Sequence, residues 1–253
     1  MNNNCIKYIT PFLVATILIG AETADSRDVE KEKSFLQSMN MLFRGSGNNE
    51  DVLDINTLTT WVTKEGYFTY DADPTHTNGS YLDEDVSVIF SQGLVWGGLL
   101  PDVGGASDGG DTTYVKVNGS TYANGLSAGV ILDSGIGDDP ENYQVWKVNL
   151  ADNSNWSDWP ADKGAPYDDV DGDGMYSAAA DKPGWPGADQ TIWIVANDIG
   201  QNISTPPSTE FAGSDPIGIE YRLTMGCYNF LSTNPLGNMA LQQARIIYKG
   251  LPD

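Results

Sequence analysis

Short runs of β-favouring residues alternate with turn residues over most of this chain. From residue 54 onward, the β-branched and aromatic residues gather in segments that Gly, Asp, Asn and Pro separate. Segments of this kind are typical of strands in all-β domains. The pattern predicts nine strands: Leu58–Val62, Tyr67–Tyr70, Val86–Trp96, Thr113–Val117, Ala128–Leu132, Tyr143–Leu150, Thr191–Ala196, Pro216–Phe230 and Met239–Lys249.

No helical pattern interrupts these strands, and no repeat of solenoid or propeller period occurs. The fold class is therefore predicted to be all-β, a single β-sandwich-like domain of antiparallel strands over residues 54–253. Apolar side chains that alternate, or nearly so, indicate strands with one buried face. The residues expected in this core are Val115, Val117, Val145, Val148, Ile192, Ile194, Ile217 and Ile219.

The first 21 residues have the pattern of a secretory signal peptide. A single base, Lys7, precedes an apolar run from Tyr8 to Gly20. That run is shorter than the roughly 20 apolar residues that span a bilayer, so cleavage after Ala21 or Ala24 is expected, with an uncleaved anchor as the alternative. The mature chain is then secreted and extracellular or at the cell surface, without membrane insertion. Residues 22–53 form a helical or linker lead-in, with an amphipathic helix predicted within Ser26–Phe43.

Charge excludes several classes of partner. The chain has 35 Asp and Glu against 13 Lys and Arg, which gives a formal net charge of -22. Such a surface repels nucleic acid and anionic lipid and attracts multivalent cations. The chain has two cysteines, and removal of the signal peptide takes Cys5 away and leaves Cys227 alone, so no intramolecular disulfide is expected.

One motif suggests metal chemistry. The segment Ala151–Asp189 is long and poor in apolar runs, and inside it lies a D-x-D-x-D-G pattern that ends at Gly174. Alternate carboxylates of this kind converge on Ca²⁺ in calcium loops, where Gly at the sixth position permits a sharp turn. Position twelve is Ala180 instead of a bidentate Glu, which favours a calcium-binding β-type loop over an EF-hand. The predicted ligands are Asp169, Asp171, Asp173, the Met175 carbonyl, Ser177 and Asp181, with Asp168 as a possible supplement.

Two alternatives concern this same segment. The aspartates can form a solvated turn that uses their side chains to bind backbone N–H groups. The nearby rings of Trp156, Trp159 and Trp185 can lie exposed and hold a carbohydrate, or they can fold inward as the core of the segment. The sequence leaves both questions open.

Catalytic residues are not assigned. The chain has one histidine, His76, in a polar segment, and no G-x-S-x-G turn, so a serine triad is not expected. Cys227 lies in a predicted strand and suits a buried position. A pair of carboxylates is the remaining route, because two acids suffice for glycoside cleavage. The candidate acids are Glu65, Glu141, Glu210 and Glu220, of which Glu220 follows the Asp215–Ile219 run and is the one to test. A carbohydrate-active or carbohydrate-binding domain therefore stays as the alternative function.

Several segments resemble a family of very large secreted surface proteins of Bacteroidetes and related bacteria. The resemblance rests on Gly164–Tyr176, Pro183–Gly184, Gly187–Trp193, Asp54–Thr57 through Phe68, Gly93–Gly98, Asp215–Glu220 and Arg245–Gly250. It implies a secreted surface protein with further β repeats. Together with the calcium motif, it leads to the prediction of a secreted, calcium-stabilised structural or adhesive module of the cell surface, with surface glycans or other surface proteins as partners. Members usually carry a C-terminal sorting domain for type IX secretion. This chain shows no such tail, so a truncated copy is one expectation.

Overall fold

The computed structural model describes residues 49–66, 79–89, 92–101, 114–121, 126–199 and 216–251. Within these ranges the regular structure is antiparallel strands joined by turns and short 3₁₀ helices, which confirms the all-β prediction. Four predictions lie outside the described residues: the signal peptide, the helix within Ser26–Phe43, the strand Tyr67–Tyr70 and His76.

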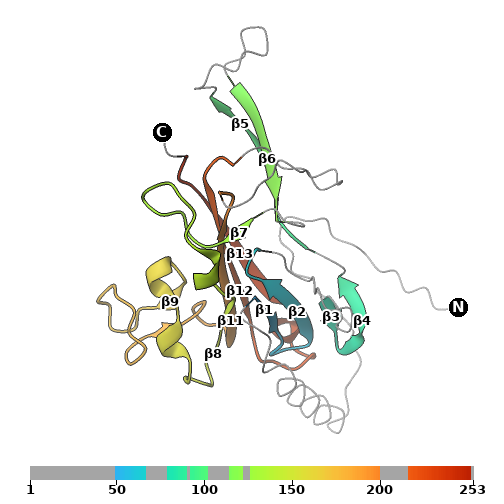
Figure 1. Ribbon diagram of the computed structural model, residues 1–253. Helices are drawn as coiled ribbons and strands as arrows, with labels where there is room; N and C mark the ends of the chain where they lie inside the picture. Colours follow the sequence, from blue (N-terminus) through green and yellow to red (C-terminus); the bar gives the residue numbers. More distant parts are fainter. Residues whose placement is uncertain are drawn as a thin grey trace, which may run out of the picture.

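A five-stranded antiparallel sheet forms the centre of the fold (Figure 1). Its order is β13-β12-β11-β7, and β8 also pairs with β11 beside β7. The longest pairing joins β12 and β13 over nine residues without a register shift. The strands are β7 (Ser127–Ala128), β8 (Trp146–Asn149), β11 (Gln190–Asn197), β12 (Ile219–Cys227) and β13 (Ala240–Tyr248).

A second, four-stranded sheet packs on one face of the central sheet. It has the order β1-β2-β3-β4 and comprises β1 (Glu50–Leu53), β2 (Leu58–Thr63), β3 (Gly79–Tyr81) and β4 (Asp83–Ile89). β1 lies just before the predicted start of the β domain at Asp54. Leu53 and Val62 from this sheet join a buried cluster with Ile192, Ile194 and Leu223 of the central sheet. This cluster is the core of a two-layer arrangement.

The other face of the central sheet is also covered. Trp193 and Val195 of β11 point there and pack with Trp146, Val148 and Trp159, the last from the 151–189 segment. Figure 1 shows β9 (Tyr167–Asp168), within that segment, on the side of the central sheet away from β1 and β2. All eight residues of β11 are therefore buried, whereas the sequence pattern indicated a half-buried strand. Both faces are apolar because each faces its own core.

Smaller elements complete the described structure. Two hairpins are formed by β5 (Val95–Pro101) with β6 (Tyr114–Ser120) and by β9 (Tyr167–Asp168) with β10 (Lys182–Pro183). The 3₁₀ helices are η1 (Pro140–Asn142), η2 (Trp156–Asp158), η3 (Ala161–Lys163) and η4 (Pro235–Asn238). The single predicted strand Val86–Trp96 is wrong, because β4 ends at Ile89 and β5 begins at Val95 in a different sheet.

The turn between β1 and β2 fastens the two sheets together. Gln190 of β11 accepts N–H bonds from Asp54 and Ile55 at 2.8 and 3.2 Å, and it donates to the Asp54 carboxylate at 2.7 Å. Asn56 donates to the Met239 carbonyl at 2.9 Å. These polar groups are buried and paired, so they fix the position of one sheet against the other.

Among the described residues, no helix is both long enough and apolar enough to cross a bilayer.

Candidate metal centre

The hairpin β9–β10 carries the acidic turn. Asp168 pairs with Lys182 and Tyr167 with Pro183, so the residues from 169 to 181 leave one strand and return on the next. The rings of Tyr167 and Tyr176 lie at the base of this turn with centroids 5.3 Å apart. A short antiparallel pair and an aromatic contact therefore bring the two ends of the turn together.

Three carboxylates converge in the turn. One oxygen from each of Asp169, Asp171 and Asp173 lies within 4.8 Å of the corresponding oxygens of the other two, and all three residues are exposed. Ligands of one Ca²⁺ stand about 2.3–2.6 Å from the ion, so oxygens on opposite sides of it are about 5 Å apart. The three oxygens fit within one such sphere. The cluster could therefore hold a metal ion.

Backbone N–H groups of the turn orient these carboxylates. Asp169 accepts from Gly172 at 2.8 Å and from Gly174 at 2.9 Å, one bond to each of its oxygens. Asp171 accepts from the N–H of Asp173 at 3.2 Å, and Asp173 accepts from Met175 at 2.7 Å. The two glycines have φ of 76° and 78°, a left-handed conformation that favours glycine. The glycine expected at the sixth position is thus required by the backbone.

Asp181 closes the turn from its far end. Its side chain is almost fully buried, and its two oxygens accept the N–H groups of Val170 at 2.9 Å and Ser177 at 2.8 Å. It does not belong to the three-carboxylate cluster. Its position instead makes it a clamp that joins the first and last parts of the turn.

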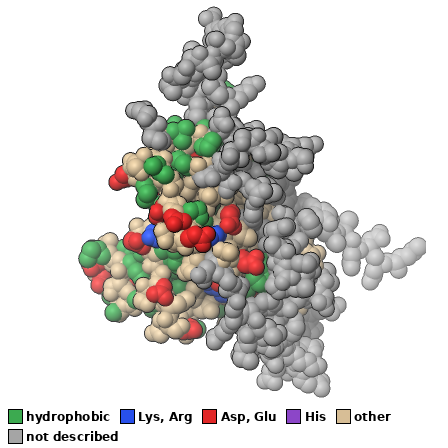
Figure 2. All heavy atoms as spheres, in the orientation of Figure 1, with side chains coloured by type: hydrophobic (Ala, Val, Ile, Leu, Met, Phe, Trp, Pro, Cys, Tyr) green, Lys and Arg blue, Asp and Glu red, His purple; other side chains and the backbone are tan. Residues whose placement is uncertain are grey.

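The turn concentrates negative charge. The pKa of Tyr167 is raised by desolvation and then by the field of Asp169, Asp181, Asp173 and Asp171. The pKa of Tyr176 is raised to about 12, first by desolvation and then by Asp181. A cation placed among these carboxylates would relieve their mutual repulsion. Figure 2 shows that acidic side chains also exceed basic ones over the described part of the face in view.

Of the six predicted ligands, the structure brings Asp169, Asp171 and Asp173 together. Met175 and Ser177 follow them in the same exposed turn, while Asp181 lies beneath it. Asp168, the possible supplement, is exposed on β9. The sequence motif therefore located the cluster. The role of Asp181 as a clamp follows only from the structure, which places the two ends of the turn side by side.

The three tryptophans do not form one exposed surface. Trp159 is 4% exposed, and its indole N–H donates to the Pro166 carbonyl at 2.8 Å. Trp156 is partly buried, and its carbonyl accepts from the Tyr176 hydroxyl at 2.7 Å. Trp185 is partly buried against Gly226 of β12. Burial removes Trp159 from the candidate carbohydrate contacts, because these rings supply the core that the segment otherwise lacks.

Glu220 is a buried carboxylate that two basic side chains neutralise. It is fully buried, and Arg222 and Lys249 form ion pairs with it at 2.6 and 3.3 Å. The N–H of Ile131 also donates to it at 3.0 Å. Both carboxylate oxygens are thus engaged by the protein itself. The contacts favour a structural role for Glu220 over that of a catalytic acid.

Cys227 has the buried position that the sequence suggested. Cys227 is a free cysteine in the core. Burial raises the pKa of its thiol, and the negative charge of Asp54 raises it further. A buried thiol with a raised pKa is a poor nucleophile.

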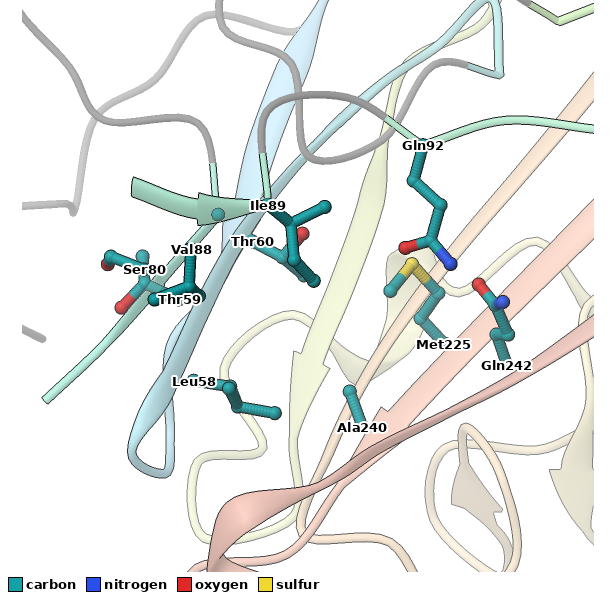
Figure 3. A pocket seen from close by; sticks show the side chains of 11 residues that line it. Leu58, Thr59, Thr60, Ser80, Val88, Ile89, Gln92, Met225, Ala240 and Gln242 are labelled. Carbon is teal, nitrogen blue, oxygen red and sulfur yellow. The ribbon is translucent and has the colours of Figure 1, made fainter. Parts of the chain in front are cut away.

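A narrow apolar groove lies where the two sheets separate. Figure 3 shows Thr60 and Ile89 on one side and Met225, Ala240 and Gln242 on the other. The Thr60 hydroxyl is buried there without a hydrogen-bond partner. Among the described residues that line the groove there is no acid, base or thiol.

Comparison with known protein families, curated proteins and solved structures found no match to this chain.

Proposed function

We propose that this chain is an exported, calcium-stabilised module that acts structurally or adhesively at a bacterial cell surface. The observation that carries the metal part is the convergence of Asp169, Asp171 and Asp173 within 4.8 Å. Calcium is the preferred ion because the three side-chain donors of the cluster are carboxylate oxygens, which suit a hard cation, and lie on an exposed turn. Extracellular calcium is millimolar, and extracellular modules bind it with dissociation constants of about 10⁻⁴–10⁻³ M.

The surface location rests on the sequence. It is supported by the predicted signal peptide, by the resemblance to secreted surface proteins and by the acidic composition. A structural or adhesive role is further supported by the contacts of Glu220 and Cys227, two residues with reactive side chains. Glu220 is neutralised by Arg222 and Lys249, and Cys227 is sealed in the core. The carbohydrate alternative loses support from the burial of Trp159.

Isothermal titration calorimetry with CaCl₂ tests the metal directly. The wild-type chain is expected to give a saturable isotherm of one site. The double variant Asp171→Asn, Asp173→Asn keeps the size of both side chains and removes two ligand charges, so its isotherm is expected to be flat. Equal binding by the wild type and this variant would refute the proposed centre.

A matched control separates ligation from general charge. Asp158 and Asp162 are exposed acids of the same 151–189 segment and lie outside the cluster. The double variant Asp158→Asn, Asp162→Asn changes the net charge by the same amount and is expected to bind calcium like the wild type. Antibody labelling of intact cells tests the location, and a signal that appears only after lysis would contradict surface display.

A further inference from the structure

Strand β13 is the least covered strand of the central sheet. It pairs with β12 on one edge and with no other described strand on the opposite edge. Four consecutive residues, 243 to 246, are exposed, although successive side chains point to opposite faces of a sheet. Both faces of the strand are therefore open along this stretch. Long, regular, open edges are templates for pairing with another strand.

An apolar row extends along one face of β13. Cross-strand neighbours share a face, so Ala244, Ile246 and Tyr248 lie on the same face as Leu223, Tyr221 and Ile219. Tyr221 and Leu223 belong to the core, but Ile246 is 47% and Tyr248 is 62% exposed. The same row begins with Ala240 and Gln242 in the groove of Figure 3. An apolar row that continues from a groove to an open edge indicates an interface.

The distribution of charge indicates which partner would pair with β13. Residues 221–252 contain no Asp or Glu, the longest such run in a chain whose net charge is -22. Two copies of this chain repel each other wherever their acidic surfaces meet. β13 carries only Arg245 as a charged residue, so two copies can approach there with little repulsion.

We propose that β13 is a dimerisation edge, at which β13 of a second copy pairs antiparallel to it about a two-fold axis. Antiparallel pairing of one strand with its own copy is an isologous contact and closes after two subunits. It would satisfy the open edge, join the two central sheets into one and cover Ile246 and Tyr248 of both copies. With the axis at Ala244, each Arg245 lies opposite Gln243 of the other copy instead of opposite its equivalent.

Sedimentation velocity of the purified protein under reducing conditions tests this dimer. From micromolar to near-millimolar concentration the wild type is expected to change from monomer to dimer. Molar NaCl is expected to strengthen the dimer because it screens the repulsion between two acidic subunits. A wild type that stays monomeric throughout this range in both salts would overturn the proposal.

Two variants locate the interface. Ile246→Asp places an acid in the apolar row and is expected to weaken the dimer about tenfold or more. Leu99→Asp makes the same change at an exposed position of β5, 61% exposed, and is expected to leave the dimer unchanged. If circular dichroism shows that Ile246→Asp does not fold, Tyr248→Asp replaces it. A dimer that tolerates the folded β13 variant as well as it tolerates Leu99→Asp would place the interface elsewhere.

Discussion

The buried carboxylate of Asp181 accepts the backbone N–H of Ser177 at 2.8 Å, four residues before it in the chain. The other oxygen of Asp181 accepts the N–H of Val170 at the opposite end of the acidic turn. One side chain thus holds both ends of a turn whose remaining acids are exposed. Asp181 therefore shapes the turn, while Asp169, Asp171 and Asp173 are the carboxylates available to the proposed ion.

These two roles predict that, without metal, the free energy of unfolding falls far more in one variant than in the other. Asp181→Ala removes two hydrogen bonds to a buried charged group and is expected to lower the free energy of unfolding by about 2–4 kcal/mol. Asp171→Asn alters an exposed side chain and is expected to change it by less than about 0.5 kcal/mol. Chemical denaturation in a chelator measures both. A larger loss for Asp171→Asn than for Asp181→Ala would reverse the two roles.

The charge network at Glu220 predicts a stability defect. Glu220→Gln removes the charge that pairs with Arg222 and Lys249, both partly exposed, and is expected to cost about 1.5–3 kcal/mol. Glu141, an exposed acid of η1, supplies the control variant Glu141→Gln, for which little change is expected. Urea denaturation gives both values. If Glu220→Gln keeps full stability but abolishes a measurable glycosidase activity, the structural assignment of Glu220 is wrong.

Two glycines of similar conformation predict very different effects of alanine. Gly164 and Gly172 have φ of 99° and 76°. A Cβ at Gly164 would collide with the Arg222 guanidinium, whereas one at Gly172 would meet nothing within 4 Å. Gly172→Ala is expected to cost only the left-handed strain of about 1–2 kcal/mol. Gly164→Ala is expected to cost more, because it also displaces Arg222 from Glu220. Thermal melting measures the loss of stability in both variants. Equal losses would argue against a link between Gly164 and the Arg222–Glu220 ion pair.

Tyr143 predicts a loss of stability in alkali. Desolvation and a 2.8 Å hydrogen bond to Asp138 raise its pKa from 10.0 to about 12 in the folded protein. Between these values the unfolded chain loses the phenol proton and the folded chain keeps it, so the contribution is complete below pH 10 and is lost as pH approaches 12. Tyr143→Phe is expected to be less stable than the wild type at neutral pH because it lacks the bond to Asp138.

The stability difference between Tyr143→Phe and the wild type should therefore shrink above pH 10, the ordinary pKa of tyrosine. Denaturation of both proteins across that range measures the difference directly, and other titrating groups cancel in it. A difference that stays constant from neutral to strongly alkaline pH would show that the phenol of Tyr143 keeps its ordinary pKa.

The convergence of the three carboxylates was predictable because its information is local. Asp169, Asp171 and Asp173 stand at alternate positions of one short turn, so spacing alone brings their carboxylates together. The role of Asp181 was not predictable in the same way. Its clamp depends on the register of β9 with β10, which sets Asp168 opposite Lys182.

The fold class followed from the strand pattern, but the layers did not. The alternation in β11 indicated one buried face, and only the covering segment shows that Trp193 and Val195 face a second core. The apolar run across Ile89 and Val95 gave no sign of its division between two sheets. Both features are set by contacts between residues distant in sequence, which a local pattern does not encode.

The most direct test of the account is a high-resolution crystal structure of the protein grown in calcium. The proposed calcium centre predicts an ion at about 2.3–2.6 Å from one oxygen each of Asp169, Asp171 and Asp173. It would be contradicted by carboxylates that bond only to the N–H groups of their own turn and to water, with no ion between them.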